Sequence, residues 1–309
     1  MATQQTAVRT IFVDAEEFTG PTRGLWSDAW RRLIKNRLAL VSMVVLLTIA
    51  FVAFAAPYIP ALEHHDPAAI STDKHFGPGT EHWFGTDQLG RDLWARCLEG
   101  VRISLTIGLG VQVVVLAIGL AAGVAAAFGG RFTDNIVMRF TDIMYAFPQL
   151  LFVILIREML FHRDIPGLTN TLVIILAIGL LEWTTIARLV RGQMLSLAER
   201  DFVMAARSLG APRWRVVVQH MLPNTLGPVI VAITFGIPTA IFVEAILGFL
   251  GLGIPKPTVS LGYLVADGYA TIQRNVWTVI FPASALATLM LCFTFLGDGL
   301  RDALDPRSR

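Results

Sequence analysis

Long stretches without a charged residue set the pattern of this chain. Four of them have 25, 28, 28 and 23 residues, and they cover residues 38–62, 103–130, 216–243 and 275–297. About 20 apolar residues in a helix cross the hydrocarbon core of a bilayer. Each stretch therefore predicts a membrane-spanning helix.

Two weaker segments, residues 136–160 and 170–190, are apolar but contain charged residues. In the first, the charges lie near the two ends, and in the second they are Glu182 and Arg188. Charged side chains near the end of a span can extend to the lipid headgroups. Both segments are thus expected to span, which brings the prediction to six transmembrane helices.

The composition agrees with an all-α integral membrane protein. Hydrophobic residues make up 54% of the 309 residues, charged residues only 16%, and the mean hydropathy is +0.62. A soluble domain carries roughly 25% charged residues. The chain is therefore expected to lie in the bilayer.

The Lys and Arg residues are divided unequally between the two sides that six spans define. One side carries 17 of the 25, and the opposite side carries eight. Cytoplasmic loops are enriched in Lys and Arg, so both termini and the 188–222 loop are expected in the cytoplasm. The predicted units are a cytoplasmic segment 1–37, a first span 38–60, an extracytoplasmic outer loop 61–102, a five-helix core 103–297 that includes a loop at 192–222, and a cytoplasmic tail 298–309.

Residues 25–37 place apolar side chains near one helical face and Arg31, Arg32 and Lys35 elsewhere. This pattern favours an interfacial amphipathic helix, and the alternative is a plain positive flank. The outer loop holds four of the six histidines, but nothing in their spacing brings them to one point. A solvated loop is therefore expected there, and a metal site is the alternative.

The cytoplasmic loop has the pattern of a helix–turn–helix elbow. A short helix-forming stretch at 202–209 is followed by Gly210 and Pro212, and a second stretch covers 213–221. Gly210 fits the position after a helix end, and Pro212 fits the start of the next helix. The small residues Ala205 and Ala206 would let a partner surface approach closely.

This stretch resembles the EAA loop of binding-protein-dependent ABC permeases, in which Glu-Ala-Ala, Gly and a Leu-Pro pair recur at fixed spacing. Ala205, Ala206, Gly210, Leu222 and Pro223 match, whereas Met204 stands at the acidic position. Three further blocks are similar to the C-type subunit of the dipeptide and oligopeptide permeases. They read HWFGTDQLGRDLWARCLEGVRISL from His82, WTTIARLVRGQMLSL from Trp183 and VEAILGFLGLGIPKPTVSLG from Val243.

The resemblance implies a type I ABC importer permease fold in a prokaryotic cytoplasmic (inner) membrane. It also implies a second permease, two ATP-binding subunits and an extracytoplasmic substrate-binding protein. ATP and Mg would then be used by the ATPases, with no cofactor bound by this chain and no nucleic-acid partner. The predicted ATPase contacts are Ala205, Ala206, Arg207, Ser208, Leu209, Gly210, Leu222 and Pro223.

Four residues of the predicted spans are candidates for a pathway or gate. Ionisable groups inside a membrane are costly and therefore mark functional sites, which singles out Glu182, beside Trp183, and Glu244. Pro238 interrupts helix hydrogen bonding and can supply a hinge. Glu244 could also pair with a partner residue, or it could be hydrated at the interface.

Other functions find less support. The chain has no Gly-Lys pair of a phosphate-binding loop, so ATP must be bound elsewhere. Five of the six histidines lie in the outer loops and His220 belongs to the cytoplasmic elbow, so no His is left in the spans for a membrane-embedded enzyme. No inverted repeat typical of an ion-coupled carrier is evident. Di- or oligopeptides are the expected cargo, and nickel, glutathione or oligosaccharides are the alternatives for the same machinery.

Overall fold

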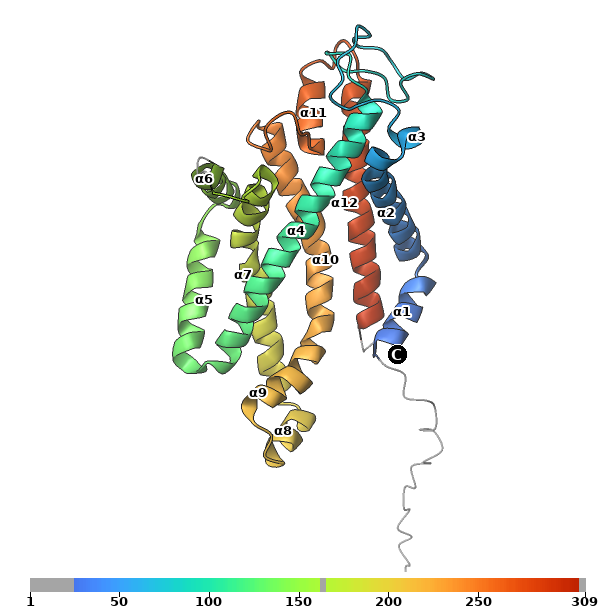
Figure 1. Cartoon of the computed structure of the whole chain (residues 1–309). Coiled ribbons are helices and arrows are strands. Elements are labelled where there is room, and N and C mark those ends of the chain that lie inside the picture. Colours follow the sequence, from blue (N-terminus) through green and yellow to red (C-terminus); the bar gives the residue numbers. More distant parts are fainter. Residues whose placement is uncertain (1–24, 162–164, 306–309) are drawn as a thin grey trace, which may run out of the picture.

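A computed structural model describes residues 25–161 and 165–305. Residues 1–24 of the expected cytoplasmic segment and residues 306–309 of the tail lie outside this part. The described residues form helices and no strand. In chain order these are α1 (Leu25–Lys35), α2 (Arg37–Ala55), η2 (Ala56–Tyr58), α3 (Pro60–Glu63), α4 (Leu93–Phe128), α5 (Gly130–Ala146), α6 (Gln149–Phe161), α7 (Asn170–Ala198), α8 (Asp201–Ser208), α9 (Arg213–Arg215), η3 (Val216–Met221), α10 (Leu222–Phe249), α11 (Leu261–Tyr269) and α12 (Trp277–Leu304) (Figure 1).

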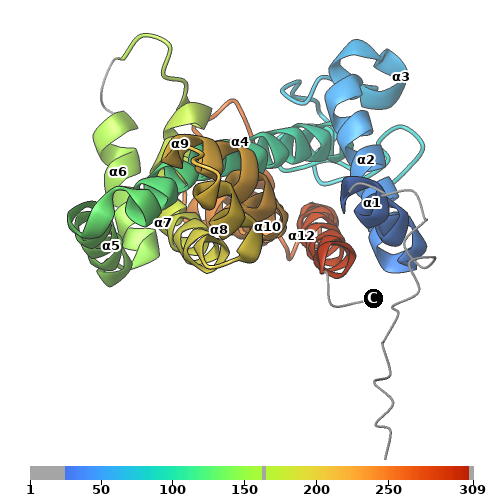
Figure 2. The same cartoon turned by 90° about the horizontal axis from the view of Figure 1, so that it is seen from below.

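Five helical segments are long and apolar enough to cross a membrane. They are Arg37–Tyr58, Leu93–Phe128, Asn170–Ala198, Arg213–Phe249 and Trp277–Leu304. The longest unbroken helix, α4, has 36 residues, which at 1.5 Å per residue is about 54 Å. That exceeds the thickness of the hydrocarbon core, and α4 accordingly runs obliquely across the bundle (Figures 1 and 2).

The expected span at 136–160 is not one straight helix. Its residues belong to α5 and α6, which meet at an angle of 98°. Pro148 explains the break, because a proline forces the preceding residue out of the helical conformation, and Phe147 has the extended angles φ −80° and ψ 133°. If this bent pair counts as one crossing, the chain has six spans as predicted.

The arrangement of the chain ends agrees with an even number of crossings. In Figure 1, α1 and the end of α12 lie toward the same end of the bundle as α8 and α9. We call this the elbow end, and the opposite end, which holds residues 64–92, the outer-loop end. Three helices extend beyond their expected spans. α4 begins at Leu93, inside the expected outer loop, α7 continues to Ala198, inside the expected 192–222 loop, and α12 continues to Leu304, inside the expected tail.

The amphipathic segment forms α1, which ends where Asn36 caps α2 by accepting a hydrogen bond from the backbone N–H of Ala39, 3.3 Å away. Ala29 and Leu33 on α1 are buried in a small cluster with Ala303 of α12. One face of α1 is therefore occupied by α12. Its position at the lipid interface stays a prediction.

The most extensive helix pair is α4 with α7. Gly119 and Gly123 lie one turn apart on α4, and a Cβ on Gly123 would stand 2.7 Å from the backbone oxygen of Ala187 on α7. A Cβ on Gly119 would likewise stand 2.8 Å from the backbone oxygen of Trp183. Small residues four apart let two membrane helices approach closely. These glycines therefore set the distance between α4 and α7.

We expect Gly123→Val to destabilise the bundle, because the added side chain must displace Ala187 and Val190. Overpacking of this kind costs about 1–3 kcal/mol, which lowers the melting temperature of the purified protein. Gly192→Val is the matched control, since Gly192 lies on α7 and a Cβ added there would meet nothing within 4 Å. Equal melting temperatures for the two variants would contradict the packing argument.

Candidate functional site

The predicted elbow is present as α8, a turn, α9 and the π-helical segment η3, which leads into α10. Gly210 occupies the turn with φ +81°, a left-handed conformation that glycine adopts without strain. Its N–H donates to the carbonyl of Arg207 at 2.9 Å, and the N–H of Ala211 donates to the carbonyl of Ala206 at 3.1 Å. These two bonds form a Schellman motif, so the turn that ends α8 is closed by its own backbone.

One side of the elbow is fixed to the bundle. Val203 of α8 and Val216 and Met221 of η3 are buried in the same apolar cluster as Val190 and Met194 of α7. The short helices are therefore attached to the cluster that contains α7, so we expect them to move with that helix.

The other side of the elbow is exposed. Of the predicted contacts, Ala205, Arg207, Ser208, Leu209, Gly210 and Pro223 are exposed, and Ala206 and Leu222 are half-buried. Met204, at the family's acidic position, is 48% exposed, and Leu209 is 89% exposed. Apolar side chains this exposed next to charged ones are typical of a surface that a partner covers.

A cavity of about 450 Å³ lies between α4, α7, α10 and the junction of α5 with α6. Its polar lining residues include Gln112, Tyr145, Gln149, Glu182 and Thr239. The Nε2 of Gln149 donates to the Glu182 carboxylate at 3.2 Å. The cavity thus has apolar walls with a few polar groups, as expected of a site that holds a ligand.

Only one of the four predicted pathway residues lines this cavity, and it is Glu182. Trp183 is buried and stacks on Phe140, with ring centroids 6.0 Å apart. Pro238 is buried within α10, which continues through it. Its role as a hinge stays a prediction.

Glu244 neither lines the cavity nor reaches solvent. Its side chain is completely buried, and it accepts a hydrogen bond from Ser104 of α4 at 3.1 Å. Its role as a pathway or gate residue stays a prediction. The residue links α10 to α4.

The outer loop contains an ion cluster that sequence reasoning missed. The Arg96 guanidinium, 1% exposed, pairs with Asp87 and with Asp267 of α11, and Arg91 pairs with the same two carboxylates. Asp87 also accepts hydrogen bonds from the backbone N–H groups of Leu89 and Arg91 at 2.8 and 3.0 Å. The sequence block that begins at His82 was the signal available, because it contains Asp87, Arg91 and Arg96, and only Asp267 comes from elsewhere.

The same loop brings together the one group of potential metal ligands found among the described residues, His65, His82 and Asp92. Sequence spacing gave no reason to join them, and the solvated loop expected there is in fact folded. The side chain of Asn275 donates to the carbonyls of Phe76 and Thr86 at 3.0 and 3.1 Å, which ties the loop to the start of α12.

Two known protein families match this chain. Residues 117–309 match the family described as "Binding-protein-dependent transport system inner membrane component", and residues 24–77 match the "N-terminal TM domain of oligopeptide transport permease C". The chain belongs to the binding-protein-dependent transport permeases. The resemblance predicted from the elbow and the three sequence blocks is thereby confirmed.

Curated relatives of the permease match over nearly its whole length. The oligopeptide transport system permease protein OppC of Bacillus subtilis is 40% identical over 96% of this chain and 94% of its own length. The dipeptide transport system permease protein DppC of Bacillus subtilis is 39% identical over 96% and 90%. The OppC protein of Escherichia coli K12 is 39% identical over 93% of each chain.

The fold of the permease is also known from solved structures. A chain of the inward-facing MetNI methionine ABC transporter matches with a TM-score of 0.56 at 20% identity, over 67% of this chain and 95% of that chain. A second crystal form gives a TM-score of 0.54 at 23% identity. The predicted importer permease fold is confirmed by this likeness.

Proposed function

We propose that the permease forms half of the translocation pathway of an ATP-driven importer for di- or oligopeptides, as its C-type subunit. The observation that carries the proposal is near-complete alignment, at 38–40% identity, with proteins named as oligopeptide or dipeptide permeases. The match of residues 24–77 to the N-terminal domain of oligopeptide transport permease C favours the C-type subunit.

The proposed assembly contains a second permease, two ATP-binding subunits and an extracytoplasmic binding protein. The elbow end faces the cytoplasm, since its loops carry most of the Lys and Arg residues. Both termini then lie in the cytoplasm, and the outer-loop end faces the binding protein. ATP and Mg act in the partner ATPases.

The elbow is the proposed ATPase contact. Its exposed face, formed by Ala205 and residues 207–210, is presented outside the bundle, while Val203 and Met221 hold the other face to the core. ATP binding can move the permease only if the ATPase holds this surface differently in its two states. Met204 stands at the position where the family has an acidic residue. We therefore propose that docking depends on the shape of the elbow surface and not on a charge at this position.

The cavity is the proposed half-pathway, and Glu182 is its acidic group. A peptide carries a terminal ammonium group, which a carboxylate can bind through charge-assisted hydrogen bonds. Glu182 lies on α7, which leads directly to the elbow. A displacement of the elbow would therefore reach the cavity through one helix.

Reconstitution tests the function itself. Co-expressed with its cognate permease and ATPases, the chain should co-purify with them. The purified complex in vesicles should then support ATP-dependent uptake of labelled peptide when the binding protein is present outside the vesicles. Vesicles without ATP, and vesicles lacking this chain, are the controls. Uptake of nickel, glutathione or an oligosaccharide in place of peptide would overturn the peptide assignment and leave the importer assignment standing.

Gly210→Val should uncouple ATP hydrolysis from uptake. A left-handed conformation costs an ordinary residue about 1–2 kcal/mol, so the variant should distort the turn at the end of α8. We expect the ATPase stimulation by loaded binding protein and the peptide uptake to fall together. Gly210→Asn is the matched control, since asparagine tolerates this conformation. Unchanged uptake and stimulation in Gly210→Val would contradict the elbow assignment.

Glu182→Gln tests the pathway, because it removes the charge and keeps the size of the side chain. We expect peptide uptake to fall roughly 5- to 10-fold, which corresponds to losing about 1–1.4 kcal/mol of charge-assisted binding. Glu81→Gln, in the exposed part of the outer loop, should leave uptake unchanged. Equal uptake rates for the two variants would show that Glu182 does not act on the cargo.

A further inference from the structure

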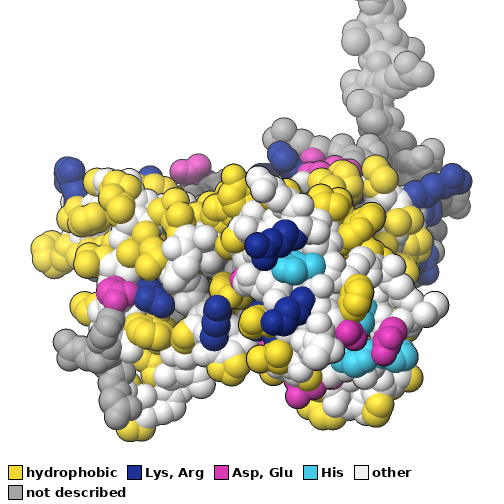
Figure 3. All heavy atoms as spheres, turned by 90° about the horizontal axis from the view of Figure 1, so that it is seen from above, with side chains coloured by type: hydrophobic (Ala, Val, Ile, Leu, Met, Phe, Trp, Pro, Cys, Tyr) yellow, Lys and Arg dark blue, Asp and Glu magenta, His cyan; other side chains and the backbone are white. Residues whose placement is uncertain are grey.

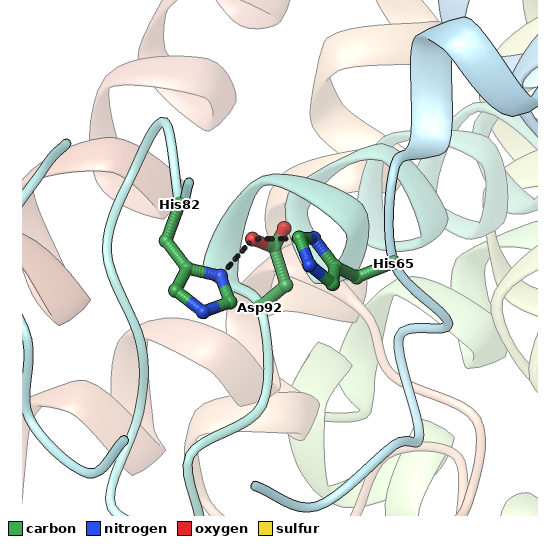
Figure 4. Close-up of side chains that lie close together, drawn as sticks. All are labelled: His65, His82 and Asp92. Carbon is green, nitrogen blue, oxygen red and sulfur yellow. Dashed lines mark hydrogen bonds and ion pairs between the residues drawn. The ribbon is translucent and has the colours of Figure 1, made fainter. Parts of the chain in front are cut away.

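Asp92 has a carboxylate whose two oxygens serve different partners. It is the N-cap of α4, and its Oδ1 accepts a hydrogen bond from the backbone N–H of Ala95 at 2.8 Å. Its Oδ2 lies 2.8 Å from Nδ1 of His82 and 3.7 Å from Nδ1 of His65. His82 and Asp92 are hydrogen-bonded, and the two imidazole rings lie next to each other beside the carboxylate, with centroids 4.7 Å apart (Figure 4).

The distances fit the coordination of a small divalent ion. The ligand atoms of the three residues lie within 4.8 Å of one another. Neighbouring ligands of a tetrahedral Zn²⁺ ion, with bonds of about 2.1 Å, are about 3.4 Å apart. The observed separations lie on both sides of this value, so small side-chain rotations bring all three atoms to one centre.

His65 supplies the second observation. Its Nδ1 is buried, yet it has no hydrogen-bond partner among the described residues. A buried polar atom without a partner is rare. An ion between this nitrogen and Asp92 would satisfy it, and would also explain why two imidazoles point at one carboxylate oxygen.

The nearby cations do not compete for Asp92. Arg91 and Arg96 pair with Asp87 and Asp267. The carboxylate of Asp92 is therefore left to interact with the two histidines.

The group is also accessible from outside. The side chains of Asp92 and His82 are only 3% and 11% exposed, whereas that of His65 is 39% exposed. Figure 3, which views the outer-loop end, shows histidine side chains at the surface beside acidic ones. An ion can enter past His65, and the same opening leaves a coordination position for water or an incoming ligand.

We propose that His65, His82 and Asp92 bind one divalent transition-metal ion of the Zn²⁺ class on the outer face of the permease. Two imidazoles and one carboxylate suit such ions, whereas Ca²⁺ and Mg²⁺ prefer oxygen ligands. The ion joins the segment after α3, the middle of the outer loop and the first residue before α4. It therefore fixes the folded loop to the membrane helix that it precedes.

Zinc titration of the assembled transporter tests the site. The tag-free complex is stripped with a chelator, placed in nanodiscs and titrated with Zn²⁺ by calorimetry, and Co²⁺ is then used to record the visible absorption of a tetrahedral site. We expect the wild-type complex to bind one more ion per copy of this chain than the complex with the triple variant His65→Asn/His82→Asn/Asp92→Asn. Each single variant should weaken binding by more than the roughly 10- to 100-fold that an outer-shell partner contributes.

Two choices keep the test decisive. Asp92→Asn retains the cap of α4, because asparagine is an equally good N-cap, so loss of binding in this variant is not loss of the helix. His75→Asn, in the same loop but outside the group, is the matched control and should bind as the wild type does. Absence of stoichiometric Zn²⁺ binding in the wild type, or binding that survives all three single variants, overturns the proposal.

Discussion

The backbones of α4 and α7 lie so close together that a side chain at Gly119 or Gly123 would have no room between them. Water cannot drive this contact inside a bilayer, where lipid tails are as apolar as the helices, so close packing of small residues must hold the pair. Since α7 also carries Glu182 and continues into the elbow, the contact fixes the cavity wall and the elbow to one scaffold. The positions of the cavity and of the elbow both depend on how closely α4 approaches α7.

The elbow joins two helices that both line the cavity, α7 before it and α10 after it. Its turn is closed by backbone hydrogen bonds around Gly210, and its inner face is held by Val203 and Met221. The π-helical segment η3, a type of irregularity found frequently at functional sites, is the one departure from regular helix at this junction. A push on the exposed face would therefore act on two cavity walls, with η3 as the place where the second connection can adjust.

Sequence patterns predicted the features that depend on neighbouring residues. Gaps between charges located the spans, and Gly210 with Pro212 located the elbow, because both signals act within a few residues. The bend at Pro148 was also local, but a proline inside an apolar stretch does not say whether the helix kinks or ends. The hydrogen-bond partner of Glu244, Ser104, could not be named from the sequence because it is 140 residues away, and no local pattern reveals such a pair.

The outer loop shows the same limit at a larger scale. A solvated loop was expected there, and the described residues between Glu63 and Leu93 form no helix, but long-range polar contacts give this segment a defined structure. Arg91 pairs with Asp267 and so holds the loop to α11, and Asn275 holds it to the start of α12. Asp92 both starts α4 and faces two histidines. A loop fixed at these points presents a defined surface at the outer-loop end of the bundle. It leads directly into α4, the helix that packs most extensively against α7.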